Sequence, residues 1–253
     1  MRFISLQSGS SGNCIYVEAG DRKLLFDAGI PGVHAARRLA ACGRDIRDVD
    51  ALIISHDHGD HARCIGVYQR KFALPVCITK TTLAAARRYP LGSLREVRFF
   101  RSGQKITFGR VTVETIRTPH DAADPVAFVV DDGDCRLGIM TDLGHVFDAL
   151  PDVMASLDAV LIESNYDPPS LAHGPYPQLL KDRIKGNGGH LANEESAGLL
   201  VGAASRLRWA CLGHMSEANN TPQLAMKAHR AAIGQGLPIH LAGRYEPTEV
   251  LKL

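Results

Sequence analysis

The stretch SHDHGDHARC, Ser55 to Cys64, constrains this chain more than any other. Three histidines and two aspartates occupy the six positions from His56 to His61, directly after the apolar run DALIIS. A short apolar run of this kind predicts a buried strand. Because a strand directs alternate side chains to one face, His56 and His58 can converge on a point just beyond its end. The fold must therefore deliver a dense cluster of imidazoles and carboxylates to one place.

Histidine and aspartate at this spacing indicate a metal site. His56 and His58 form a natural pair of ligands, and Asp60 with His61 could hold a second ion a few ångströms away. Four ligands do not complete two sites, so further ligands are expected at the ends of later strands. Asp27, in LLFDAG, is expected to accept a hydrogen bond from a ligand imidazole. The further candidates at strand ends are His120, Asp142 and His214.

The order of the predicted elements indicates an α/β fold. A β-rich first half is followed, from residue 146 onward, by alternating helices and strands, with no linker between them. This order predicts two sheets packed together with helices outside, in a single domain over residues 1–253. The predicted strands cover residues 2–6, 14–19, 23–29, 50–55, 75–79, 96–100, 105–108, 111–116, 126–132, 135–142, 159–165, 209–214, 238–242 and 249–253. The predicted helices cover residues 33–42, 62–71, 81–88, 147–157, 176–184, 194–205 and 221–233.

Composition limits the kind of metal site and says little about partners. The six cysteines are far apart with no C-x-x-C pair, so reduced thiols are expected, and a metal must find His and carboxylate ligands. A net charge of +2 neither demands nor excludes nucleic acid, and Arg95, Arg98 and Arg101 are interpreted as a solvated face. The chain shows no signal-peptide pattern and no long apolar segment, so we expect a cytoplasmic protein with no membrane partner.

The pattern H-x-H-x-D-H, together with the spaced later ligands, resembles the metallo-β-lactamase superfamily. Further pieces resemble its YycJ/WalJ-type branch in order from Ser8 to Asn220: SGSSGNC, LLFDAG, ISHDHGDH, PHDAADPVAF, TDLGHV, LIESNYD, YPQLLKDRIKGNGGHLANEESA and LGHMSEANN. The resemblance implies an αββα sandwich of two mixed β-sheets, with helices on the outer faces and metals at the edge between the sheets.

The resemblance also implies a centre of two divalent ions. Two ions bridged by a carboxylate and a hydroxide provide a nucleophile at neutral pH and a Lewis acid for a substrate oxygen. The ligand set suits zinc, manganese or iron, and zinc is the expected metal. Asp60 and Asp142, the two aspartates among the expected ligands, are also expected to be catalytic. Metal one is expected on His56, His58 and His120, and metal two on Asp60, His61 and His214, with Asp142 as the bridge.

Other residues are expected to serve the substrate. His190 resembles the histidine that related nucleases place near the scissile phosphate, which implies a general acid for the leaving oxygen. KDRIK, residues 181–185, could neutralise the phosphates of a polymer. Tyr166 stands where the branch often has histidine. The residues expected to bind substrate are Ser10, Ser11, Asn13, His145, Asn165 and Tyr166.

The resemblance implies a phosphodiesterase, specifically a 5′-to-3′ exonuclease acting on DNA ends. A small-molecule metallohydrolase that cleaves a cyclic phosphodiester, a phosphoester or a lactone is the alternative, and an iron-dependent redox enzyme of the same fold is a third hypothesis. Flavin-linked di-iron reductases usually carry glutamate where this chain has His58. Large RNA-processing nucleases insert a domain that the short stretch from Asp142 to His214 does not accommodate. No oligomeric state is predicted.

Overall fold

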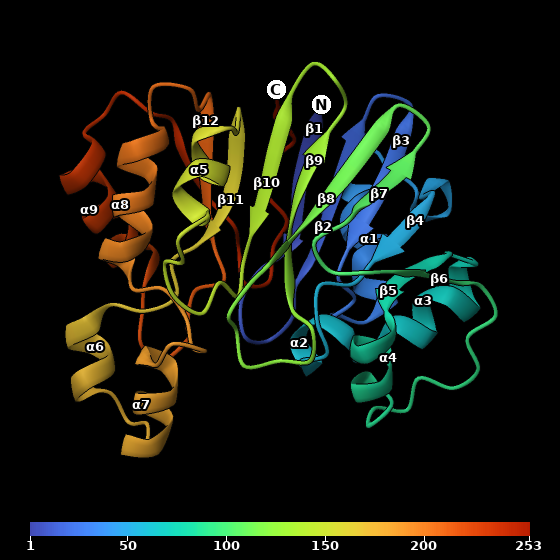
Figure 1. The fold of residues 1–253 in the computed structure, drawn as a ribbon, viewed down its shortest axis with the longest axis horizontal. Helices are drawn as coiled ribbons and strands as arrows, with labels where there is room; N and C mark the ends of the chain where they lie inside the picture. Colours follow the sequence, from blue (N-terminus) through green and yellow to red (C-terminus); the bar gives the residue numbers. More distant parts are fainter.

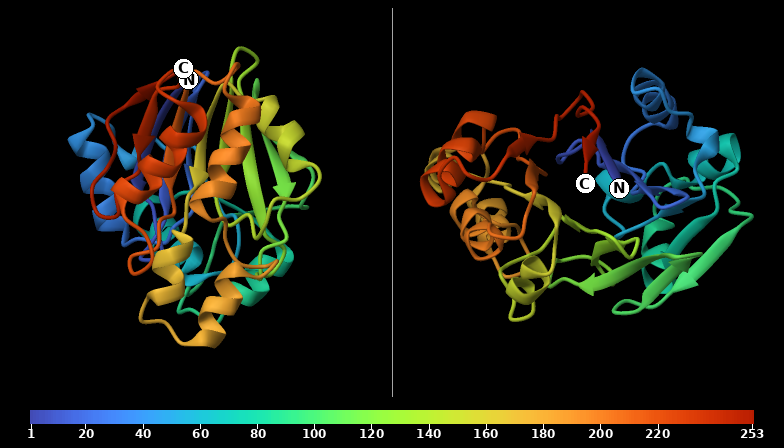
Figure 2. Two further views of the ribbon diagram at one scale, coloured as in Figure 1. Left: turned by 90° about the vertical axis from the view of Figure 1, so that its left-hand side faces the viewer. Right: turned by 90° about the horizontal axis from the view of Figure 1, so that it is seen from above.

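Two mixed β-sheets of seven strands each face one another in the computed structural model, which describes residues 1–253 (Figure 1). Helices α1, α3 and α4 cover the outer face of one sheet, and α5, α8 and α9 cover the other (Figure 2). The predicted αββα sandwich is therefore confirmed. None of the helices combines the length and apolar character that crossing a membrane requires.

The first sheet contains the N-terminal strands and both kinds of strand pairing. Its first strands pair antiparallel, and the strands from β3 to β6 are parallel. In spatial order the strands are β14 (Leu251–Lys252), β1 (Arg2–Gln7), β2 (Cys14–Ala19), β3 (Arg22–Phe26), β4 (Ala51–Ile53), β5 (Val76–Thr79) and β6 (Val97–Phe100). The helical elements of this half are α1 (Gly32–Ala41), η1 (Ile46–Asp48), α2 (Gly59–Ala62), α3 (Ile65–Phe72) and α4 (Lys80–Ala86).

The second sheet combines an antiparallel meander, β7 to β10, with parallel strands from β10 to β13. In spatial order its strands are β13 (Ile239–Leu241), β12 (Trp209–Gly213), β11 (Ala159–Glu163), β10 (Arg136–Met140), β9 (Val126–Asp131), β8 (Val111–Arg117) and β7 (Lys105–Phe108). The helices of this half are α5 (Leu150–Ala155), α6 (Pro168–His173), α7 (Gln178–Lys185), α8 (Asn193–Ala203) and α9 (Pro222–Ile233).

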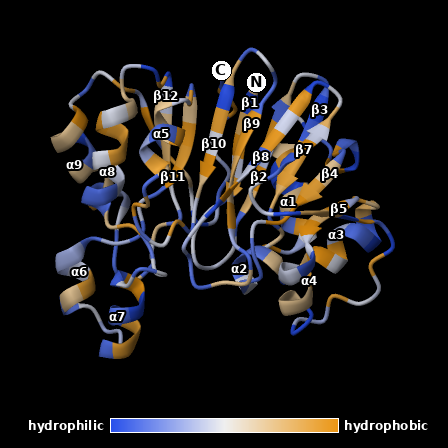
Figure 3. Ribbon diagram, viewed as in Figure 1, coloured by the Kyte–Doolittle hydropathy of each residue, from blue (hydrophilic) through white to orange (hydrophobic).

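The strands are apolar on both faces because both faces are covered. In β9, Phe128 and Val130 point between the sheets, whereas Val129 points toward the helices. Phe26 meets Phe128 across the core, with ring centroids 5.1 Å apart, and burying such a ring contributes about 1.5–3 kcal/mol. Figure 3 shows the hydrophobic colour gathered along the strands. A shared core of this kind is what a single domain requires, and the single domain over residues 1–253 stays a prediction.

The strand directions bring the candidate ligands to one edge of the sandwich. Asp27 follows β3 and His56 follows β4 in the first sheet, while His120, Asp142 and His214 follow β8, β10 and β12 in the second. Within each sheet these strands run in the same direction. Their carboxyl ends lie at the lower edge in Figure 1, beside α2, with α6 and α7 projecting beyond it.

Several predicted boundaries are wrong, and each error has a local cause. The predicted helix 62–71 is two helices, α2 and α3, because the Cys64 N–H donates to Ala28 O and leaves the helical pattern. The predicted strand 23–29 ends at Phe26, where Asp27 takes a left-handed conformation with φ 64°. Helix α6 was not predicted. It begins at two prolines, and the Asp167 side chain caps it by accepting from the Ser170 N–H.

Candidate metal centre

Three of the candidate residues have an uncommon backbone conformation. Asp27, Asp142 and His214 have φ values of 64°, 56° and 50°, in the left-handed region that residues other than glycine rarely adopt. Each such residue costs about 1–3 kcal/mol, so it persists only where the surroundings fix it. Asp27 and His214 directly follow a strand end, and Asp142 lies two residues beyond one. At each of these positions the turn directs the side chain into the cluster.

Backbone hydrogen bonds tie three loops into one scaffold beneath the cluster. The Asn13 N–H donates to Asp60 O at 2.7 Å, the Gly29 N–H donates to Asn13 O at 3.0 Å, and the Ala28 N–H donates to His61 O at 2.7 Å. This packing requires glycine at position 29, because a Cβ there would lie 1.6 Å from Asp60 O. The loop SGSSGN, the turn after β3 and the histidine loop are therefore fixed relative to one another.

The first group of possible ligands comprises His56, His58 and His120, whose ligand atoms lie within 4.8 Å of one another. His120 Nε2 lies 3.2 Å from His58 Nδ1. The orientation of His120 is set by its other nitrogen, because Nδ1 lies 2.9 Å from Gly189 O. His56 Nδ1 lies 2.9 Å from Ser55 Oγ, which leaves His56 Nε2 facing the group.

The second group comprises Asp60, His61 and His214, again within 4.8 Å of one another. His61 Nε2 lies 3.3 Å from Asp60 Oδ2. On its other side, His61 Nδ1 lies 2.7 Å from Asp27 Oδ2, and the Ser55 N–H donates to Asp27 Oδ1 at 2.8 Å. Asp27 thus fixes the ring of His61 and the backbone of the histidine loop together, which is how carboxylates commonly orient ligand imidazoles.

The Asp142 carboxylate lies between the two groups. Its Oδ1 is 3.5 Å from His120 Nε2 in the first group. Its Oδ2 is 3.2 Å from His61 Nε2 and 3.4 Å from His214 Nδ1 in the second. Each oxygen therefore faces a different set of nitrogens, which is the arrangement that a carboxylate bridging two ions requires.

The unsatisfied polar atoms of the cluster fit a metal centre. His56 Nε2, Asp142 Oδ2 and His214 Nδ1 are buried and have no hydrogen-bond partner. Buried polar atoms usually find a partner because leaving one unpaired costs about 1–3 kcal/mol. All three point into the cluster, and nitrogen with carboxylate oxygen is a donor set that zinc and similar divalent ions accept. These residues therefore fit the two ions that the sequence predicts.

The charges of the cluster also suit metal binding. Burial, reinforced by His61, holds the pKa of His56 well below its ordinary value, and burial lowers the pKa of His58 and His214. Burial alone would raise the pKa of Asp142, but the surrounding histidines hold it well below its usual range. Neutral imidazoles and ionised carboxylates are the forms that bind metals. His61 is the exception, because its carboxylate neighbours outweigh burial and raise its pKa.

His190 lies beside the two groups and is held by a carboxylate that the sequence analysis missed. Its Nδ1 lies 3.1 Å from Glu163 Oε2, and Glu163 is fully buried. Burial opposes protonation of His190, but this hydrogen bond outweighs it and raises the pKa of His190. The Leu143 N–H donates to Glu163 Oε1 at 2.9 Å, which fixes the carboxylate. His190 also forms a possible ligand group with His120 and Asp142.

A cavity of about 340 Å³ opens onto the cluster. Ser10 and Asn165 line it, as expected of substrate-binding residues, and Asn165 also holds His214 by donating to its carbonyl oxygen at 2.8 Å. Arg183 of α7 also lines the cavity and forms an ion pair with Asp121 at 2.5 Å. The remaining lining residues include His58, Asp60, Asp142, His190 and His214.

Four residues expected to bind substrate are not part of the lining of this cavity, and their role stays a prediction. Ser11 accepts from Gln7 at its Oγ, and His145 Nδ1 lies 2.7 Å from Asn187 O. Asn13 is buried, with its Nδ2 2.9 Å from His61 Nε2, so it contacts a candidate ligand and lies outside the cavity lining. Tyr166 packs in a small apolar cluster with neighbours that include Leu171, Ile184 and Ala192.

The family pattern of the metallo-β-lactamase superfamily matches residues 8–178. The chain belongs to this superfamily. It is 35% identical over 228 residues to exodeoxyribonuclease WalJ of Streptococcus pneumoniae serotype 2, strain D39, an alignment that covers 88% of this chain and 85% of that protein. It is 31% identical over 259 residues to exodeoxyribonuclease YycJ of Bacillus anthracis, an alignment that covers 99% of this chain and 98% of that protein. The predicted resemblance to the YycJ/WalJ-type branch is confirmed.

Solved structures agree on the fold. The metallo-β-lactamase fold protein YhfI from Bacillus subtilis superposes with a TM-score of 0.75 at 17% identity, over 98% of this chain and 100% of that chain.

Two residues of the present chain that the sequence analysis did not single out also support the candidate metal centre. Ser8 Oγ accepts from the His214 N–H at 2.8 Å. Asp57, inside the histidine motif, points away from the ligands and accepts from the Ala123 N–H at 2.7 Å.

The loop scaffold gives a direct prediction. Gly29→Ala should lower the free energy of unfolding by about 3 kcal/mol, since the new Cβ must displace the Asp60 carbonyl from a packed position. Urea denaturation in the presence of a chelator measures this effect apart from metal binding. Gly198→Ala is the matched control. No atom lies within 4 Å of a Cβ at position 198 in α8, so stability should stay equal or rise by about 0.5–1 kcal/mol. Equal stability of both variants would contradict the scaffold.

Proposed function

We propose that this protein is a di-metal phosphodiesterase that removes nucleotides from DNA ends as a 5′-to-3′ exonuclease. The observation that carries the proposal is the Asp142 carboxylate, whose two oxygens face two separate groups of ligand atoms. The names of the WalJ and YycJ relatives supply the substrate class. A metal-dependent hydrolase with a nucleic-acid substrate is the simplest function that unites these observations.

We assign one metal ion to each of the two groups of possible ligands described above. The first ion would be held by His56, His58 and His120 and the second by Asp60, His61 and His214. Asp142, whose two oxygens face both groups, would serve both ions. When bound, the two ions supply a nucleophile at neutral pH and a Lewis acid for the phosphate oxygen. Zinc is the metal that this donor set favours, with manganese or iron as alternatives. The cytoplasmic location expected in the sequence analysis stays a prediction.

The protein's own side chains orient the substrate and move the proton. Ser10, Asn165 and Arg183 line the cavity. The Arg183 guanidinium pairs with Asp121 through Nε and Nη2, which leaves Nη1 to contact a phosphate oxygen. His190 is the proposed general acid. Glu163 accepts a hydrogen bond from its Nδ1, which leaves Nε2 to donate a proton to the leaving oxygen. Lys181 and Lys185 lie on the same helix as Arg183 but do not line the cavity.

An assay on end-labelled DNA and RNA, single- and double-stranded, with added zinc or manganese, tests the function. DNA labelled at its 5′ end should release labelled nucleotide first, and chelation should stop the release. Asp142→Ala should abolish the activity while circular dichroism shows the fold retained. Arg37→Ala, an exposed change on α1, should leave the rate unchanged. Hydrolysis of small esters without cleavage of any polymer would favour the small-molecule hydrolase instead.

The role of His190 has its own test. His190→Ala should leave the metal content unchanged and lower turnover on DNA by about two to four orders of magnitude, the usual scale of general acid catalysis. The nitrophenyl ester of thymidine 5′-phosphate has a good leaving group, so its hydrolysis should fall much less. Equal losses on both substrates would remove His190 as the acid. Loss of metal would instead make it a ligand, in the group that it forms with His120 and Asp142.

A further inference from the structure

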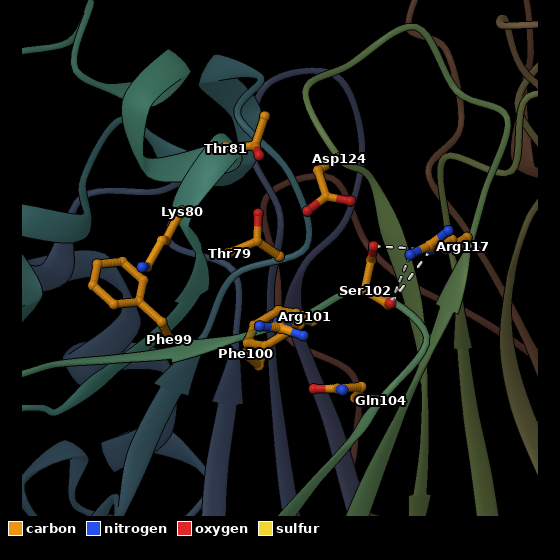
Figure 4. Close-up of a pocket in the computed structure, with 10 residues that line it drawn as sticks. All are labelled: Thr79, Lys80, Thr81, Phe99, Phe100, Arg101, Ser102, Gln104, Arg117 and Asp124. Carbon is orange, nitrogen blue, oxygen red and sulfur yellow. Dashed lines mark hydrogen bonds between the residues drawn. The ribbon is translucent and has the colours of Figure 1, made fainter.

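A second cavity, of about 790 Å³, lies outside the metal centre. It opens between β6 and β7, the edge strands of the two sheets. Its lining comes from the start of α4, from β6 and the turn that follows it, from β8, and from Asp124 in the loop before β9 (Figure 4). The proposed hydrolysis uses none of these residues.

The cavity carries an excess of positive charge. Lys80 and Arg101 are exposed, and neither has a carboxylate within ion-pair distance. The third cation, Arg117, is held in place by Ser102, because its Nε donates to Ser102 Oγ at 3.0 Å and its Nη2 donates to Ser102 O at 3.2 Å. Asp124 is the single carboxylate in the lining. Two positive charges therefore remain uncompensated, in a cavity that would attract an anion.

An exposed aromatic ring accompanies these cations. Phe99 on β6 is 51% exposed, so about half of its side chain is accessible to solvent. The Lys80 Nζ lies 5.7 Å from the centroid of this ring. Figure 4 shows Lys80 beside Phe99 on one side of the cavity, Arg101 in the middle, and Ser102 with Arg117 on the other side. Cations beside an exposed aromatic ring are a combination that binds single-stranded nucleic acid, through phosphate contacts and base stacking.

We propose that this cavity binds the DNA strand a few nucleotides away from the phosphate at the metal centre. Lys80, Arg101 and Arg117 contact phosphates, and one base stacks on Phe99. The site is sequence-tolerant, because it offers a stacking face and charges and no defined pattern for reading base edges. This inference rests on the proposed exonuclease function and extends it to the part of the substrate that is not cleaved.

One loop connects the cavity to the metal centre. His120 and Asp124 stand four positions apart on this loop, so their Cα atoms are at most about 14 Å apart. About four nucleotides of stacked strand, at about 3.4 Å each, span that distance. The loop is fixed at its middle, where the Thr82 Oγ1 donates to Ala123 O at 2.8 Å and the Ala123 N–H donates to Asp57 at 2.7 Å. The cavity and the ligands therefore keep a constant separation.

The test compares short and long substrates on the intact protein. Oligothymidylates of two and about ten nucleotides with cleavage-resistant phosphorothioate linkages, labelled at the 3′ end, are titrated against the metal-loaded protein so that binding is measured without cleavage; the longer one reaches beyond the separation estimated above. The variants are Lys80→Ala with Arg101→Ala, and Phe99→Ala with Phe99→Trp as its rescue. Arg37→Ala with Lys227→Ala removes the same charge from exposed positions on α1 and α9.

The wild-type protein should bind the longer oligomer more tightly, and the double variant Lys80→Ala/Arg101→Ala should lose most of that gain. Each lost contact to a single-strand phosphate lowers the slope of log Kd against log salt concentration by about 0.7. Between about 50 and 200 mM salt, the Kd of the wild type should therefore rise about sevenfold more than the Kd of the double variant, which lacks two such contacts. Phe99→Ala should weaken binding at least about fivefold, with Phe99→Trp restoring it. The control pair Arg37→Ala/Lys227→Ala should behave as wild type.

Hydrolysis of the nitrophenyl ester of thymidine 5′-phosphate separates the two proposals, because this substrate is a single nucleotide and lacks the further strand that the cavity is proposed to bind. All of these variants should hydrolyse it at the wild-type rate. The cavity proposal would be overturned if the double variant kept the full increase in affinity from the short to the long oligomer, or if the wild type bound both oligomers equally tightly. A wild-type protein that gains affinity with length but cleaves no DNA would overturn the proposed exonuclease and leave the cavity assignment standing.

Discussion

The position of the Asp142 carboxylate, buried between two groups of histidines, is the constraint on which the rest of this structure depends. Removing a carboxylate from water costs several kcal/mol unless its surroundings compensate. His61 and His214 face one oxygen and His120 faces the other, and both sheets contribute strands that end at this point. The left-handed backbone at Asp142 and His214 adds a further cost, which the sandwich offsets by fixing every loop around the cluster.

The histidine motif organises more than the ligands. Its first aspartate, Asp57, points away from the cluster, pairs with Arg88 and fixes Ala123 in the loop that starts at His120. The same loop ends at the lining of the basic cavity between the two edge strands. A side chain within H-D-H thus sets the distance between the proposed chemistry and the proposed strand-binding surface. Glu163 has a comparable role on the opposite side, where it orients His190.

Much of the fold, and the clustering of the candidate ligands, could be predicted from the sequence, because strand alternation and motif spacing are local. The two packed sheets follow from the order of apolar runs, and the ligands follow from His56 to His61 with later residues at strand ends. The sequence could not place Glu163 beside His190 or move Tyr166 into an apolar cluster, since both depend on contacts between distant segments. Arg101, interpreted as a solvated residue, joins Arg117 only when the two sheet edges meet.

Elemental analysis of the purified protein, reconstituted with zinc and freed of loosely bound metal, tests the central claim most directly. If Asp142 joins the two groups into one centre, each chain should hold two ions, and chelation should remove both together because the bridge couples them. A saturated protein with a single ion per chain, or two ions lost in separate steps with Asp142→Ala retaining both, would contradict the account.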